Sequence, residues 1–137
     1  MNIREAIYSR LTSDATVAEL VGTRVYPHLA QPGTKTYPMV VYRDGVAVKM
    51  GGRLMRAELS VACITRDDLD GLDALRAAVV AVLHGTETRD TWGGGSEGID
   101  VKGCFLQGET TDEIYPPESP ELRYYISDQM YILWWWE

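Results

Sequence analysis

The sequence is poor in the residue types on which several classes of protein depend. Two cysteines and two histidines occur in 137 residues, and Lys and Arg together number 13 against 20 Asp and Glu. A protein that grips nucleic acid needs clustered Lys and Arg to neutralise phosphates, so the net charge of −7 argues against that role. An acidic balance suits a protein that must stay soluble before it assembles.

Long apolar runs are also missing. Arg4 and Glu5 interrupt the first ten residues and no apolar stretch of seven or more follows, so we expect no secretory signal. No run approaches the roughly 18 to 20 apolar residues that cross a membrane, so no membrane partner is expected. Cys63 and Cys104 lie far apart in strand-like runs, which favours buried thiols of a cytosolic product over a disulfide or metal pair.

Motifs that could carry catalysis are present only in fragments. Residues 93–98 match G-x-S-x-G, with Ser96 as the serine, and also G-x-G-x-x-G, but a strand is expected after them where both motifs need a helix. Residues 67–71, DDLDG, lack the later Glu of a calcium loop. His28 and His84 have no metal-like partner at short spacing, and the helix dipole explains His84 at a helix C-terminus. We therefore predict no enzyme, metal or cofactor; a hydrolase using Ser96 or His28 is an alternative.

The rest of the sequence is typical of one folded domain spanning residues 1–137, since 45% of its residues are hydrophobic. Apolar spacing predicts helices over residues 3–11, 17–21 and 68–84. We predict an α+β fold in which a four-stranded, mainly antiparallel sheet carries the helices Ile3–Leu11 and Leu69–Leu83 on one face. A short strand is expected to end at Val25-Tyr26-Pro27, and four longer strand patterns occupy residues 39–50, 54–65, 99–107 and 122–135.

A long β-hairpin is the most distinctive expected element. Gly51-Gly52 separates the strand patterns 39–50 and 54–65, and each arm is about twice the usual strand length. A hairpin of this length is expected to protrude past its own core. Exposed apolar strand tips pair readily with other chains, so we predict an interface with another chain at the tip, made by Lys49, Met50, Arg53, Leu54 and Met55.

Two further segments are candidates for contacts with a partner. Opposite its apolar face, the helix 68–84 presents Ala74, Ala77, Ala78 and Ala81, which are either an ordinary exposed alanine face or a face covered by a neighbouring subunit. The last expected strand places Tyr124, Ile126, Met130, Ile132 and Trp134 on one face, with Asp128 as a candidate bulge. In the run Trp134, Trp135 and Trp136 the side chains alternate, and both core packing and a partner contact remain open.

Residues 108–121 are predicted to form an acidic, proline-rich connection. No Lys or Arg balances their carboxylates, which belong to Glu109, Asp112, Glu113, Glu118 and Glu121.

In their order along the chain, these elements resemble the tail completion (tail terminator) family of long-tailed bacteriophages, which is also found in prophages and gene transfer agents. The resemblance covers nearly the whole chain, and a Pro-Gly loop leading to Tyr-Pro is its most specific part. The residues that carry it are Ile3–Leu11, Val17–Val21, Gly22-Thr23-Arg24-Val25-Tyr26, Ala30-Gln31-Pro32-Gly33, Tyr37-Pro38-Met39-Val40-Val41-Tyr42 and Leu69–Leu83.

The resemblance implies a structural virion protein, made and assembled in the bacterial host cytoplasm. Such proteins form a ring, usually of six subunits, on the head-proximal end of the tail tube, where the ring ends tube polymerisation and offers a surface for head joining. Its partners would be further copies of the chain, the tail tube protein and a head-closure or connector protein. DNA would pass through the ring without specific binding, and the five acidic residues of 108–121 are candidates for lining its lumen. Alternatives are a head-closure or adaptor protein and a small-ligand module, which predicts a monomer with an enclosed apolar pocket.

Overall fold

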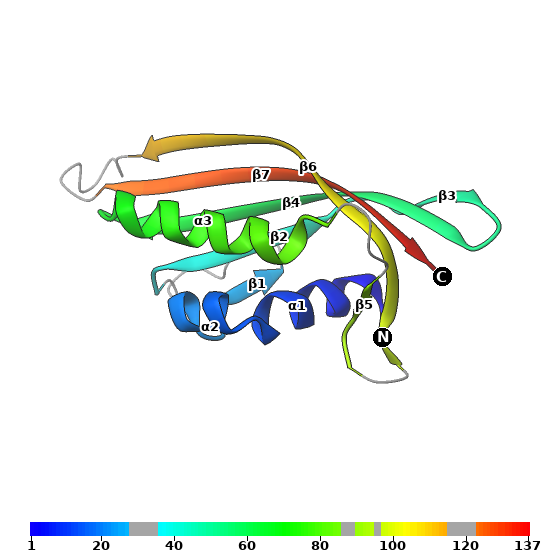
Figure 1. Ribbon diagram of the computed structural model, residues 1–137. Coiled ribbons are helices and arrows are strands. Elements are labelled where there is room, and N and C mark those ends of the chain that lie inside the picture. Colours follow the sequence, from blue (N-terminus) through cyan, green and yellow to red (C-terminus); the bar gives the residue numbers. More distant parts are fainter. Residues whose placement is uncertain (28–35, 86–89, 95–96, 115–122) are drawn as a thin grey trace.

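The computed structural model describes residues 1–27, 36–85, 90–94, 97–114 and 123–137, in which three helices pack on one face of a curled, mixed β-sheet (Figure 1). None of the helices in these ranges is long and apolar enough to cross a membrane. The elements in chain order are α1 (Ile3–Ser13), α2 (Ala15–Val21), β1 (Val25–Pro27), β2 (Met39–Asp44), β3 (Val48–Gly51), β4 (Leu54–Arg66), α3 (Leu69–Leu83), β5 (Asp90–Trp92), β6 (Ile99–Ile114) and β7 (Tyr124–Trp136).

The sheet has the order β1-β2-β4-β7-β6-β5, and β3 pairs with the part of β4 that extends beyond β2. The β1–β2 pair is parallel and the other pairs are antiparallel. The predicted α+β class is confirmed, but the predicted sheet of four mainly antiparallel strands is wrong, because seven strands lie in the described residues. The expected arm 39–50 is split at Gly45, whose N–H donates to the Glu58 carbonyl. Strand β5 lies between the predicted helix 68–84 and the predicted strand 99–107, where no strand was expected.

The helix ends follow from local capping. Asn2 and Glu5 form a capping box at the start of α1, the Asp14 side chain accepts from the Val17 N–H at the start of α2, and Asp68 accepts from the Gly71 N–H at the start of α3. The predicted helices therefore agree with the observed ones to within two residues at each end. All three, rather than the two expected, cover the same face of the sheet (Figure 1).

The hydrophobic core lies between the helices and that face. Apolar side chains of all three helices meet the inward-facing side chains of β2, β4 and β7, and Cys63 and Cys104 are buried there as free thiols, as predicted. The Tyr42 hydroxyl donates to the Arg4 carbonyl at 3.3 Å, which joins β2 to α1. Fully buried members of the core include Ile7, Leu11, Val17, Val40, Leu59, Leu72, Val79 and Leu133.

Strand β6 is longer than the sequence indicates. Residues 108–114, expected in a loop, continue the strand and pair with β7 as far as Ile114–Tyr124. Backbone hydrogen bonding to a neighbour overrides the low strand propensity of these acidic residues. The predicted bulge at Asp128 is wrong, because Asp128 pairs regularly with Ala62 and Thr110, and the register shifts lie in β6 instead, at Val101/Gly103 and Leu106/Gly108.

Candidate assembly surfaces

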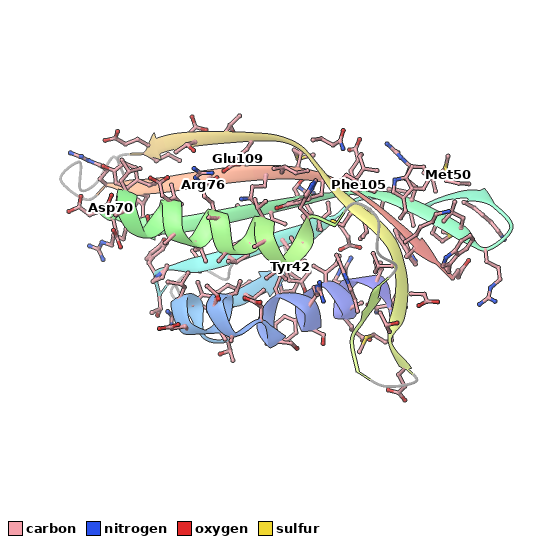
Figure 2. All side chains as sticks on the ribbon, viewed as in Figure 1. Tyr42, Met50, Asp70, Arg76, Phe105 and Glu109 are labelled. Atoms are coloured by element: carbon pink, nitrogen blue, oxygen red, sulfur yellow. The ribbon has the colours of Figure 1, made fainter. Side chains whose placement is uncertain are left out.

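The hairpin formed by β3 and the start of β4 extends away from the helices, with Met50 on its arm (Figures 1 and 2). Val46 is 87% exposed, Val48 and Met50 are about half exposed, and every residue of β3 is exposed. Of the predicted tip residues, Lys49, Met50 and Arg53 lie on this surface. Leu54 and Met55 are half-buried, and Met55 packs against the core.

On the side that the helices do not cover, which we call the open face, β7 presents a mainly apolar row of side chains. On the same side β4 presents a mixed row, with Arg56, Glu58, Ser60 and Arg66 as well as Leu54, Ala62 and Ile64. On β7 it consists of Tyr124, Ile126, Met130, Ile132, Trp134 and Trp136, which are half-buried or, for Met130, exposed, and of the exposed Asp128. Register places Ile64 beside Ile126 and Ser60 beside Met130, and the Ser60 hydroxyl donates to the Met130 sulfur at 3.0 Å. Contiguous apolar surface of this kind marks interaction sites in soluble proteins.

The three terminal tryptophans divide between the two faces, as their alternation predicts. Trp135 is 5% exposed and belongs to the core, so its inclusion among the predicted interface residues is corrected. Trp134 lies under the Arg56 guanidinium, 5.7 Å from its ring centroid, and Trp136 lies 5.3 Å from the Lys102 ammonium. Cations over these rings let large aromatic groups remain half-exposed.

The covered face of β7 carries polar side chains, and all of them are hydrogen-bonded. Ser127, Gln129 and Tyr131 are fully buried, and burial raises the pKa of the Tyr131 phenol. The Tyr131 hydroxyl donates to Gln129 Oε1 at 2.7 Å, and Gln129 Nε2 donates to the carbonyl of Arg76 at 3.1 Å. This network fastens α3 to β7.

The acidic residues at one end of the sheet, which the sequence groups together, lie in different surroundings in the structure. Glu109 accepts from Arg76 at 2.9 Å and from the Ser127 hydroxyl at 3.2 Å, beneath α3 (Figure 2), and Glu113 pairs with Arg123 at 3.0 Å. Asp112 lies on the open face, with Asp128 on the neighbouring strand. Burial and then the charge of Asp112 raise the pKa of Asp128. Two of the predicted lumen residues, Glu118 and Glu121, lie outside the described residues.

The alanine surface of α3 is narrower than predicted. Ala74, Ala77 and Ala81 are exposed, whereas Ala78 is 8% exposed and packs in the core, so Ala78 is removed from the candidate interface.

The residues considered for other functions form no site in the part of the chain that the structure describes. His28 and Ser96 lie outside it, as does the predicted loop Ala30-Gln31-Pro32-Gly33, and His84 Nδ1 accepts from the Leu106 N–H at 3.1 Å, at the end of α3. Within that part, no three His, Cys, Asp or Glu side chains gather as metal ligands. A hollow of about 490 Å³ near Tyr37 and Pro38 is lined by charged as well as apolar groups, including Arg66 and Asp68.

Comparison with known proteins decides the family. A family model described as "Tail completion protein gp17" matches residues 5–92, which is more than half of the chain. The chain belongs to this family. It is therefore a phage tail completion protein, with a structural role in tail assembly. The match ends at β5, so β6 and β7, with the acidic end and the tryptophans, lie outside it.

A solved structure extends the likeness of this tail completion protein over the whole fold. A chain of the "Virion of native gene transfer agent (GTA) particle" is 20% identical and superposes with a TM-score of 0.69, over 98% of this chain and 95% of that one. At this identity the likeness establishes a shared fold, β6 and β7 included. No curated protein matched the sequence.

Proposed function

We propose that this tail completion protein is a tail terminator. Six copies would form a ring on the head-proximal end of the tail tube, stop tube polymerisation and offer the surface to which the head joins. The family membership supports a role in completing tails, and the fold is shared with a chain of a gene transfer agent virion. The protein would be made and assembled in the host cytoplasm and would remain in the virion.

The observation that carries the proposal is the mainly apolar row of β7 on the open face, together with the hairpin that extends away from the helices. Met130 is 40% exposed and its neighbours Ile126, Ile132 and Trp134 are half-buried, whereas no such surface is needed by a protein that works alone. A contact between two different surfaces of identical subunits generates a ring when its rotation closes. A stable contact of this kind buries on the order of 1,000 Å² or more.

The partners would be further copies of the chain, the tail tube protein on one side and a head-closure or connector protein on the other. DNA would pass through the ring without specific binding, because a net charge of −7 repels phosphate. The proposal no longer includes Glu109 in the channel wall, because its carboxylate is paired beneath α3. Glu113, with a side chain 41% exposed, is retained as a candidate for that wall.

The test is a tube-length assay. Purified tube protein is polymerised with and without this chain, and tube length and end structure are measured by electron microscopy. We expect short tubes with a ring at one end. Met130→Glu should abolish capping, because it places a charge on the open face, while Glu19→Lys, an exposed change on α2, should leave capping intact.

The second candidate is a head-closure or adaptor protein, since the same apolar surface could face the head instead. If the wild-type chain leaves tube length unchanged but binds tail-less heads, the terminator proposal is wrong and the adaptor role replaces it.

A further inference from the structure

We infer that the β3–β4 hairpin of one copy docks on the open face of a second copy, at the end marked by Asp112 and Asp128. The inference rests on the proposed ring and names the two surfaces that join its subunits.

The donor surface combines apolar and basic groups. Val46, Val48 and Met50 are the exposed apolar side chains of the hairpin. From Gly45 to Ala57 the chain has Lys49, Arg53 and Arg56 and no acidic residue. The hairpin is therefore a cationic apolar arm. Its β3 side is exposed throughout, while on its β4 side the Arg53 Nε donates to the Glu137 carbonyl and Arg56 lies over Trp134.

The acceptor surface has the same mixture with the opposite charge. Met130 and Ile114 are 40% and 45% exposed, and both lie on the side of the sheet away from the helices. Asp112 pairs with Ile126 and Asp128 pairs with Thr110, which places the two carboxylates at adjacent positions on that side. In the described residues neither carboxylate has an ion pair, whereas Glu109 and Glu113 each have one.

The hairpin of a subunit is too far from the acidic end of its own open face to contact it. Leu54, beside the hairpin turn, pairs with Trp136, and Ile64, ten residues further along β4, pairs with Ile126, which pairs with Asp112. Ten residues of strand span about 34 Å, several times the screening length of about 8 Å at physiological ionic strength. The two surfaces lie at opposite ends of the sheet (Figure 1), so the contact must be head-to-tail between copies, the kind that closes into rings.

Each part of the contact has its own physical role. Burial of Val48, Met50 and Met130 would supply affinity, while Lys49 and Arg53 facing Asp112 and Asp128 would set the direction of docking. Burial and then the like charge of Asp112 raise the pKa of Asp128, and approaching cations would relieve the second of these effects.

A charge swap tests the contact. One variant carries Lys49→Glu and Arg53→Glu, a second carries Asp112→Lys and Asp128→Lys, and a third carries all four changes. The readout is the fraction of tube ends that carry a ring, seen by electron microscopy. We expect each paired variant to lose at least about tenfold in capping, because like charges across an interface cost several kcal/mol. The fourfold variant should return to within about threefold of wild type, and so should an equimolar mixture of the two paired variants.

The outcomes separate this inference from the proposed function. The docking contact is wrong if wild type caps tubes but the fourfold variant stays as defective as the paired ones. It is also wrong if the paired variants cap normally. In both cases the proposed ring is not contradicted. If wild type does not cap, the proposed function itself fails. All four positions are exposed, so the variants should fold, which circular dichroism would verify.

Covalent capture gives a second measurement. A chain with Met50→Cys and Met130→Cys is oxidised in capped tubes, and the expected product is a ladder of covalent oligomers up to the full ring. Each single variant should give none, since Cys63 and Cys104 are buried. Dimers from Met50→Cys alone would place two hairpins together and overturn the inference.

Discussion

In the middle of β7, between residues 126 and 132, polar side chains lie on the covered face and mainly apolar ones on the open face, whereas Leu133 and Trp135 nearer its end are apolar core residues. The covered face buries Ser127, Gln129 and Tyr131 completely, while the open face leaves Ile126 and Ile132 half-buried and Met130 exposed. Burial therefore depends on where the helices pack and not on which residues are more apolar. The polar set is stable inside because its donors and acceptors are paired with one another and with α3. The apolar set outside is the surface on which the proposed assembly depends.

The largest expected difference between the faces is in thiol reactivity. Cys63 is buried on the covered face, and burial raises its pKa to about 12, whereas its neighbour Ala62 is half-exposed on the open face. In Ala62→Cys, the introduced thiol should react with iodoacetamide at pH 8 at least about a thousandfold faster than Cys63, which becomes reactive only on unfolding. Peptide mass spectrometry measures both rates in one sample, and Cys104 serves as an internal control. Similar rates for the two neighbours would contradict the assignment of faces.

The adjacent tryptophans give the next largest effect. Trp135→Ala should lower the free energy of unfolding by about 3–5 kcal/mol, because it empties a core position, whereas Trp134→Ala should cost about 1 kcal/mol. Urea denaturation of the isolated subunit measures both. Tube capping should show the reverse order among folded protein, with Trp134→Ala the more defective. Equal losses of stability would show that Trp134 is buried as deeply as Trp135, which would contradict the assignment of the two faces.

A smaller effect is expected from the buried polar network. Tyr131→Phe removes the hydroxyl that donates to Gln129 and leaves a buried acceptor unpaired, which should cost about 1–3 kcal/mol of stability. Tyr8→Phe, at an exposed position on α1, is the matched control and should change stability by less than about 0.5 kcal/mol. The measurement is again urea denaturation, and a neutral Tyr131→Phe would remove the network as an explanation for the polar covered face.

The smallest effect concerns the acidic end of the open face. Because the pKa of Asp128 is raised in the folded state, the stability that its protonated form contributes is present below the unfolded pKa of about 3.9 and is lost as the pH rises through the folded value. Asp128→Asn should therefore stabilise the isolated subunit at pH 7 by no more than a few tenths of a kcal/mol, since the group is exposed, and the gain should disappear toward pH 3.

Asp70→Asn is the control for that change, because Asp70 lies in the first turn of α3 and its charge is favourable there. Thermal unfolding at several pH values distinguishes the two variants. A loss of stability in Asp128→Asn at pH 7 would mean that the carboxylate already has a partner within its own subunit.

Local signals predicted the parts of the fold that depend on neighbours in the chain. The helix periodicities, the turn at Gly51-Gly52 and the alternation of the tryptophans all appear in the structure. The extension of β6 to Ile114 was missed, because the acidic residues 108–114 look like a loop until β7 supplies hydrogen-bond partners. The short strand β5 was missed for a different reason, because three residues are too few to show the alternation of a strand.

The sequence by itself determined the spacing of apolar residues along each helix and strand, the class of fold, and the separation of a basic hairpin from an acidic segment. Only the tertiary structure decided which side of β7 is covered, that Trp135 and Ala78 are core residues, and that Asp112 lies beside Asp128. The physical reason is that side chains along a strand alternate between two sides that are equivalent in an isolated strand. Helices from distant parts of the chain pack on one of these sides and remove that equivalence.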